Sequence, residues 1–299
     1  MDLYSDVSFS TSRLITHRYS TSFSIAVNCL PNEMRQAIYS IYGFVRLADE
    51  IVDTFETADQ ESLLLNFERD YLEALANRIS LNPVLHSFIL TLYRYNIPLH
   101  LVDSFLTSMK ADLRIGKYYD SAGLDGYIYG SADVVGLMCL KVFVNGDEQL
   151  YHELEKPAKK LGSAFQKVNF LRDLKADIEQ LNRSYFPGVD ITTFNELKKL
   201  ELIEEIGKDF QEAKEGVDRL PGRSRLAVLI AYTYYMHLLR KLSNTPAGDI
   251  ISKRIRLPGH FKVFLFVKAL LSYHTTSFKI KPDGRRIPET VYEQNREPG

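Results

Sequence analysis

Apolar residues recur at spacings of three and four through almost the whole 299-residue chain, and no long stretch alternates between polar and apolar residues. This periodicity is typical of amphipathic α-helices, which bury one stripe of side chains, and it argues against a sheet-based fold. We therefore predict an all-α fold with one helical domain over residues 1–278. A charged, proline-containing segment over residues 279–299 is predicted to be a flexible tail.

The predicted helices end where proline, glycine or asparagine interrupts the periodicity. They span residues 10–28, 32–56, 60–78, 83–95, 99–116, 121–145, 148–182, 192–219, 224–243 and 247–273. The most apolar late segment, residues 261–273, contains two lysines and is well short of the roughly 20 residues that cross a bilayer. We interpret it as a core helix, with contact at a membrane surface as the alternative.

The charges of the chain nearly cancel, with 37 Lys and Arg against 38 Asp and Glu. A weak overall field argues against nucleic acid as a partner, so any anion site must be local. Cys29 and Cys139 lie in apolar surroundings without metal-ligand spacing and are interpreted as free core thiols in a reducing compartment. No secretion signal is visible at the N-terminus, so we expect a cytoplasmic protein, with peripheral membrane contact left open.

A polar stripe follows one side of the predicted helix 32–56. Tyr42, Arg46, Asp49 and Asp53 are separated by four, three and four positions, so they line up beside the apolar face of that helix. Two carboxylates four positions apart repel each other unless a cation lies between them. Solvated helix faces also carry such pairs, and this stripe alone does not establish a metal site.

The predicted helix 148–182 repeats the arrangement. Gln166, Asn169, Asp173 and Asp177 stand in register, with Arg172 beside them. Two such helices facing each other across a cavity can hold hard cations through oxygen ligands, and Mg²⁺ commonly shares its ligand shell with substrate phosphates. Arginine adds bidentate phosphate contacts. Together the stripes predict a diphosphate bound between the helices through metal, and two surface ladders of salt bridges are the alternative.

Several stretches resemble the squalene and phytoene synthase family, and the resemblance extends from about Ser20 to Lys268. YGFVRLADEIVD at 42–53 and QKVNFLRDLKAD at 166–177 look like the family's two aspartate-rich motifs. Supporting stretches are STSFSIAVNCLP at 20–31, MKADL at 109–113, YIYGSADVVGLM at 127–138 and NRSYFP at 182–187. The resemblance implies an isoprenoid-synthase-type helical bundle around a central cavity, and a transferase of isoprenoid and carotenoid biosynthesis.

The resemblance also implies roles for individual residues. The implied ligands of Mg²⁺, or of Mn²⁺ in its place, are Asp49, Asp53, Asp173 and Asp177, and Arg46 and Arg172 complete the implied catalytic set. The implied substrate-binding residues are Ser20, Ser22, Phe23, Tyr42, Tyr127, Tyr129, Gln166, Asn169, Tyr235 and Arg254. Asp133 departs from the pattern, because the family usually has glycine at that position.

The implied reaction is a head-to-head condensation of two allylic prenyl diphosphates through a cyclopropyl diphosphate. Ile25, Ala26 and Val27 are small to medium in size and leave room for a long chain, which favours geranylgeranyl diphosphate and phytoene. Farnesyl diphosphate, giving squalene or dehydrosqualene, is the alternative, and NADPH is not expected unless the product is squalene. Outside the family, the alternatives are a head-to-tail elongase, a terpene cyclase and a non-catalytic metal-binding scaffold. No pattern specifies an oligomeric state.

Overall fold

The computed structural model of the protein describes residues 2–55, 57–114, 120–179, 183–190, 192–258, 265–271 and 273. Its regular elements are helices, and no strand occurs within these ranges, which confirms the predicted all-α fold. The elements are α1 (Leu3–Tyr19), α2 (Thr21–Val27), α3 (Asn32–Asp53), α4 (Gln60–Asn77), α5 (Pro83–Arg94), α6 (Leu99–Arg114), α7 (Ser121–Ile128), the π-helical turn η1 (Tyr129–Asp133), α8 (Val134–Val144), α9 (Glu148–Glu179), α10 (Glu196–Arg219), α11 (Gly222–Ser243) and α12 (Ala247–Ile250).

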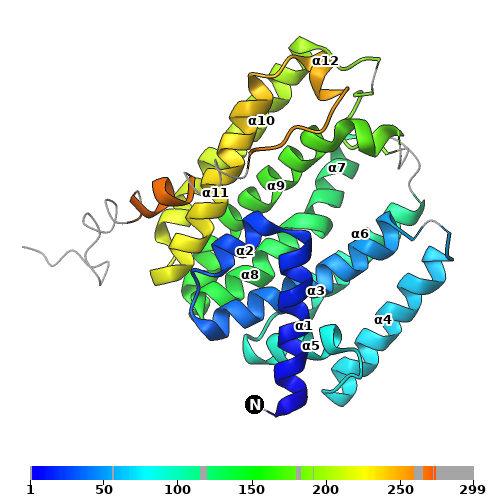
Figure 1. The fold of residues 1–299 in the computed structure, drawn as a ribbon, viewed down its shortest axis with the longest axis vertical. Coiled ribbons are helices and arrows are strands. Elements are labelled where there is room, and N and C mark those ends of the chain that lie inside the picture. The colour runs from blue at the N-terminus through cyan, green and yellow to red at the C-terminus, as the bar shows by residue number, and fades with distance from the viewer. Residues whose placement is uncertain are drawn as a thin grey trace, which may run out of the picture.

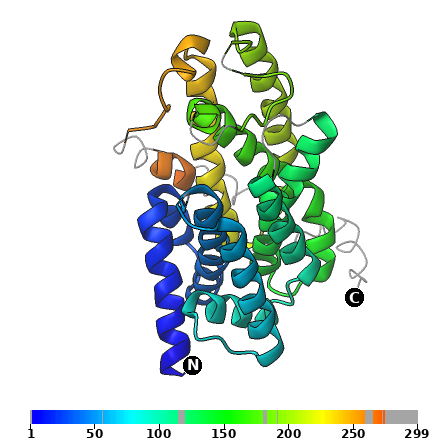
Figure 2. The ribbon, with the colours of Figure 1, turned by 90° about the vertical axis from the view of Figure 1, so that its right-hand side faces the viewer.

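The long helix α9 organises one half of the molecule. It packs against α8, η1, α10 and α11, while α1 packs against α3 and α5 in the other half (Figure 1). Seen from the side, α1 lies along one edge with the N-terminus at its lower end (Figure 2). Helices from the first and second halves of the chain therefore meet near the middle of the molecule.

Two clusters of buried apolar side chains hold these halves. One contains most of the apolar face of α3, where the ring of Phe44 stacks on that of Phe88 with centroids 4.0 Å apart. The other contains Ala164, Val168 and Leu171 of α9. The two helices that carry the predicted stripes are thus anchored mainly in different clusters, each by burial of its apolar face.

The predicted helix 10–28 is two helices, because Ser20 interrupts it. Ser20 has an extended backbone, with φ −143° and ψ 98°, and its side chain accepts a hydrogen bond from the backbone N–H of Phe23 at 3.3 Å. Serine is a strong N-cap residue because its oxygen satisfies an N–H that the first turn leaves unpaired. The break places Ser20 and Ser22 at the wall of the cavity described below.

The predicted helix 247–273 is wrong. Helix α12 ends at Ile250, residues 251–258 are not helical, and helical structure is found again at residues 265–271. Pro258 disfavours the helical conformation of the residue before it, and Arg254 in the non-helical segment reaches across to Asp173. Residues 259–264 and the predicted tail, 279–299, lie outside the described residues.

One helical segment, Ala122–Val144, is long and apolar enough to cross a membrane by length and composition alone, with a mean hydropathy of 1.5. It comprises α7, η1 and α8, and 56% of its most apolar 18-residue stretch is buried inside the fold. Tyr127, Val135 and Leu140 of this segment line the internal cavity. We therefore interpret it as a core helix of the bundle.

Candidate functional site

A cavity of about 710 Å³ lies among α2, α3, α6, α8, α9, α10 and α11, a volume typical of small-molecule sites. Both predicted stripes open onto it. The predicted site residues that line the cavity are Ser20, Ser22, Phe23, Tyr42, Arg46, Asp49, Asp53, Tyr127, Gln166, Asn169, Arg172, Asp173, Asp177, Tyr235 and Arg254. Two surface ladders of salt bridges therefore do not account for these carboxylates.

The cavity has a polar end and an apolar end. Its carboxylates come from the C-terminal parts of α3, α6 and α9. Toward the opposite ends of α3 and α9, and where α8 ends and α11 begins, its wall is formed by Leu30, Ile38, Phe143, Leu154, Leu220 and Val228. Such a site suits a ligand with a charged head and a long hydrocarbon chain.

On the α3 side, Asp53 is held by a residue that the stripe did not predict. Arg183 donates from Nη1 to Asp53 Oδ1 at 2.8 Å and from Nη2 to the carbonyl oxygens of Val52 and Asp112, each at 3.2 Å. Arg46 forms an ion pair with Glu50, one turn along α3. The two arginines thus hold carboxylates of α3, while Asp49 makes no recorded ion pair within the described residues.

On the α9 side, Asp173 is bound by two guanidinium groups. Arg172 donates from Nε to Oδ1 at 3.0 Å and from Nη2 to Oδ2 at 2.5 Å, and Arg254 donates to Oδ2 at 3.0 Å. Asn169 accepts a hydrogen bond from the hydroxyl of Tyr235 at 3.3 Å. These contacts orient the predicted diphosphate-binding side chains toward one another.

The carboxylates that lack a bound arginine have raised pKa values. Burial and the neighbouring charge of Asp53 raise the pKa of Asp49 to about 7. Burial, Asp173 and Asp53 raise that of Asp177 to about 8. Neither α3 nor α9 has a basic residue in its last turn, where the helix dipole already disfavours negative charge. Carboxylate oxygens that are not paired with an arginine are suitable ligands for a hard divalent cation.

The protein alone does not enclose such an ion. Among the described residues, no three His, Cys, Asp or Glu side chains converge closely enough to hold a metal. Mg²⁺ usually keeps several waters and takes other ligands from substrate phosphates rather than from an all-protein cage. The four aspartates therefore fit Mg²⁺ that completes its ligand shell with diphosphate and water.

Three further cavity residues were not predicted from chemistry, although their stretches MKADL and NRSYFP carried the resemblance. These are Asp112, Arg183 and Tyr185. Tyr127 donates to Asp112 Oδ2 at 2.9 Å, and the rings of Tyr127 and Tyr185 stack with centroids 5.2 Å apart. Burial raises the pKa of Asp112 to about 7, partly offset by Arg183. Asp112, Tyr127 and Tyr185 thus form a buried part of the cavity wall beside the aspartates of α3.

Two predicted positions, Tyr129 and Ile25, do not line the cavity among the described residues. Tyr129 lies in η1, where Lys159 Nζ is 5.8 Å from the centroid of its ring. Ile25 is likewise absent from the lining, whereas its neighbours Ala26 and Val27 are present. Helical geometry is the reason, because adjacent residues point about 100° apart and only part of α2 can face the cavity.

The two cysteines are free, and both are partly buried. Cys139 lies in the cavity wall, and burial raises its pKa to about 12. A thiol with such a pKa stays protonated and is neither a good nucleophile nor a ready metal ligand.

Stability without metal should depend on pH. A carboxyl group whose pKa is raised in the folded state binds more protons there than in the unfolded chain, so stability is lost as pH rises from the ordinary value near 3.8 to the raised values. Between about pH 5 and about pH 8 the two shifts together correspond to several kcal/mol, at about 1.4 kcal/mol per pKa unit, so we expect the melting temperature of the metal-free protein to fall by on the order of 10 °C. Thermal unfolding in the presence of a chelator measures this loss.

The variant Asp177→Asn provides the control. It removes the group with the highest raised carboxyl pKa, so its melting temperature should vary less with pH and exceed that of the wild type near pH 8. An unchanged slope in this variant would show that the loss comes from groups elsewhere.

Comparison with known proteins identifies similar sequences over most of the chain. The squalene/phytoene synthase family model matches residues 16–260. The phytoene synthase of Arthrospira platensis is 27% identical over 290 residues, covering 88% of this chain and 93% of that protein. The 15-cis-phytoene synthase of Synechococcus elongatus is 25% identical over 283 residues, covering 87% and 91%.

Solved structures agree in fold. A dehydrosqualene synthase in complex with ligand superposes with a TM-score of 0.77 at 23% identity, covering 91% of this chain and 98% of that one. Squalene synthase from Alicyclobacillus acidocaldarius superposes with a TM-score of 0.71 at 21% identity, covering 82% and 98%. With an isoprenoid-synthase-type helical bundle and a family match over most of its length, the chain belongs to the squalene/phytoene synthase family.

Proposed function

We propose that this protein is a Mg²⁺-dependent prenyltransferase that condenses two molecules of geranylgeranyl diphosphate head to head to phytoene, through a cyclopropyl diphosphate. The observation that carries the proposal is the pairing of two carboxylate stripes, on α3 and α9, across one cavity whose other end is apolar. The polar end suits two diphosphates, and the apolar end suits their hydrocarbon chains.

The depth of the cavity supports a long substrate. Along α3 the lining extends from Asp53 to Ile38, about 22 Å at 1.5 Å per residue. Ala26 and Val27 add small side chains to the same wall. Two of the relatives are named as phytoene synthases, which supports the twenty-carbon substrate. A shorter match, 26% identical over 196 residues, is the 4,4'-diapophytoene synthase of Staphylococcus haemolyticus, so the fifteen-carbon substrate is tested beside it.

The chain's own residues would bind and orient the leaving diphosphate. Arg46 and Arg172 lie in the cavity wall beside the aspartates, where their guanidinium groups can make bidentate contacts with phosphate. Asn169, held by Tyr235, presents an amide at the same end. When bound by Asp49, Asp53, Asp173 and Asp177, Mg²⁺ would neutralise charge on the diphosphate and so favour breakage of the allylic C–O bond.

The aromatic wall would protect the allylic cation. Phe23 stacks on Tyr42 with ring centroids 5.0 Å apart, and Phe165 stacks on Tyr235 at 4.1 Å. Ring faces attract cations, and a closed apolar wall keeps out the water that would quench them. The second molecule's double bond can then attack the cation, and loss of a proton from the resulting cation to the released diphosphate closes the cyclopropane ring.

The test is a product analysis. Purified protein is incubated with Mg²⁺ and either geranylgeranyl or farnesyl diphosphate, with and without NADPH, and the hydrocarbons are identified by mass spectrometry. We expect phytoene from the longer substrate without NADPH. A thirty-carbon product from the shorter substrate alone would overturn the assigned chain length, and no coupled product from either would overturn the proposed reaction.

A further inference from the structure

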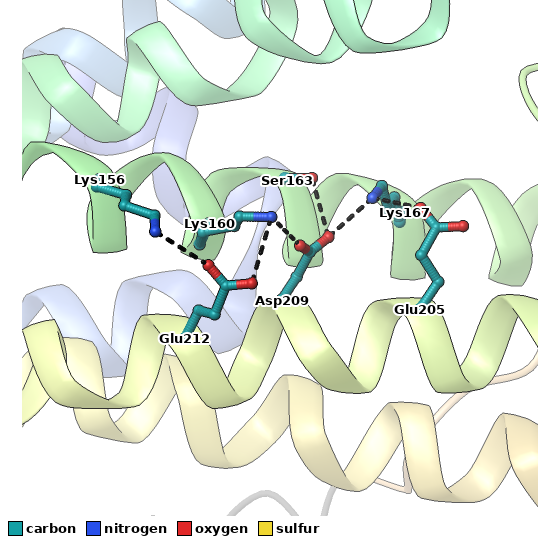
Figure 3. Close-up of polar contacts among 7 residues, drawn as sticks. All are labelled: Lys156, Lys160, Ser163, Lys167, Glu205, Asp209 and Glu212. Atoms are coloured by element: carbon teal, nitrogen blue, oxygen red, sulfur yellow. Dashed lines mark hydrogen bonds and ion pairs between the residues drawn. The ribbon is translucent and has the colours of Figure 1, made fainter. Parts of the chain in front are cut away.

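The face of α9 next to its cavity stripe carries a second polar row that the proposed reaction does not use. Lys156, Lys160, Ser163 and Lys167 follow one another at spacings of four, three and four, and they meet Glu205, Asp209 and Glu212 on α10 (Figure 3). We call this set the α9–α10 ladder. It joins the helix that carries Asp173 and Asp177 to a helix that carries no predicted site residue.

The centre of the ladder is buried and fully paired. Asp209, 3% exposed, accepts hydrogen bonds from Lys160 Nζ at 2.7 Å, Lys167 Nζ at 2.8 Å and Ser163 Oγ at 3.2 Å. Lys167, 6% exposed, also donates to Glu205 at 2.6 Å. Although burial opposes its charge, these partners lower the pKa of Asp209, and they raise that of Lys167. The pair is therefore ionised at neutral pH.

Stability does not explain why charges occupy this place. Removing two charges from water costs free energy that their attraction only partly returns, and apolar residues of similar volume often serve equally well. Apolar contacts flank the ladder already, with Ala164 and Val168 of α9 in one cluster with Ile206 and Phe210 of α10. Hydrogen-bonded ion pairs fix the relative orientation of two packed helices, whereas burial of apolar area is non-directional.

The orientation of α9 matters because the α9–α10 ladder and the cavity stripe lie on this one helix. Lys167 directly follows Gln166, so the ladder and the cavity stripe are offset by about 100° around the axis of α9. A carboxylate lies about 5 to 6 Å from the helix axis, so a rotation of about 10° moves it by about 1 Å. A displacement of that size can lower a catalytic rate by about 100-fold.

We propose that Lys167 and Asp209 are positioning residues that fix the rotation of α9 and thereby the placement of Asp173 and Asp177. The inference rests on the proposed function, because it assigns the ladder a role in presenting the second carboxylate stripe. Neither Lys167 nor Asp209 lines the cavity, so both act through the helix and do not touch substrate.

The test replaces the buried pair with apolar residues, in the variant Lys167→Met/Asp209→Leu. Lys160 keeps Glu212 as a partner at 3.7 Å, and Glu205 is exposed to water, so no buried charge is left unpaired. We expect the Mg²⁺ concentration for half-maximal activity to rise about tenfold and kcat to fall about 10- to 100-fold. The Mg²⁺ concentration for half-maximal activity is the decisive measurement. Partial unfolding lowers the fraction of active protein but does not change this concentration.

The matched control is Lys156→Met/Glu212→Leu, which removes the same kinds of charge from the same two helices at an exposed position, where Lys156 and Glu212 are 83% and 46% exposed. It should behave as the wild type, and so should Lys167→Arg. If Lys167→Met/Asp209→Leu does not fold, the neutral pair Lys167→Gln/Asp209→Asn takes its place. An unchanged Mg²⁺ requirement in the buried variant, or an equal rise in the exposed control, overturns the proposal.

A substrate-free measurement separates this proposal from the proposed function. Mg²⁺ with inorganic diphosphate should raise the melting temperature of the wild type, and the buried variant should need about ten times more Mg²⁺ for the same shift. A wild type that shows neither turnover nor this shift contradicts the proposed function. A wild type that shows both, with a buried variant that matches it, contradicts only the positioning role.

Discussion

Replacing Asp49 or Asp173 with asparagine should lower turnover by about 10² to 10³ while the protein stays folded. Each side chain lies in the cavity wall, on opposite stripes, and an electrostatic contact that acts on the leaving group contributes about 3 to 4 kcal/mol to catalysis. Asparagine keeps the shape but removes the charge that a cation requires. Steady-state rates at saturating Mg²⁺, with circular dichroism as the folding check, measure the effect.

The control for this experiment is Asp133→Asn. Asp133 has a partly buried carboxyl group whose pKa is also raised to about 7, chiefly by burial, and its Oδ1 has no hydrogen-bond partner among the described residues. It does not line the cavity, so this variant should retain turnover within a factor of about 3 of the wild type. Wild-type rates in Asp49→Asn and Asp173→Asn would instead show that the two carboxylate stripes do not take part in the reaction.

Replacing Arg183 with methionine should destabilise the protein by about 2 to 3 kcal/mol, or roughly 5 °C in melting temperature. The Arg183 side chain is only 10% exposed, and its loss leaves the carboxylate of Asp53 and two backbone carbonyls without their donor. The Asp53 side chain is itself 38% exposed, so water compensates part of its loss, and the remaining cost comes mainly from the two buried carbonyl oxygens. Thermal and urea unfolding of the metal-free protein measure this change.

Arg254→Met is the matched comparison, because Arg254 also pairs with an aspartate of a stripe. Its side chain is 49% exposed, and exposed ion pairs contribute at most about 1 kcal/mol. Asp173 also keeps Arg172 as a partner in this variant. Similar losses of stability in the two variants would show that burial is not what makes Arg183 important.

The stripes were predictable because each lies within a single helix. The spacing from Tyr42 to Asp53, and that from Gln166 to Asp177, becomes an alignment in space as soon as the helix forms, whatever the helix later packs against. That the two stripes share one cavity was a hypothesis at that stage, and the structure brings them together.

The remaining parts of the site depend on contacts between segments far apart in the chain. Arg183 reaches Asp53 across 130 positions, and Tyr127 reaches Asp112 across 15. No periodicity within one helix carries information about such pairs. The stretches that contain them could be recognised, but which of their side chains enter the cavity could not.

The wrong helix prediction and the position of Tyr129 have the same origin. Residues 247–273 have a helical pattern of apolar residues, yet Pro258 and the contact from Arg254 to Asp173 take that segment out of a continuous helix. Tyr129 lies in the π-helical turn η1 and not on the cavity wall. A π-turn adds a residue to one turn and so changes which side chains face inward beyond it.

The amino-acid sequence by itself determined the helical class of the fold, the two carboxylate stripes and the family, because these follow from local spacing and from motifs within single helices. Only the tertiary structure decided that Arg183 pairs with Asp53, that Tyr129 does not line the cavity, and that Asp209 pairs with two lysines of α9. These features arise from the rotation and approach of packed helices. Side-chain packing and paired charges determine that geometry across the whole molecule.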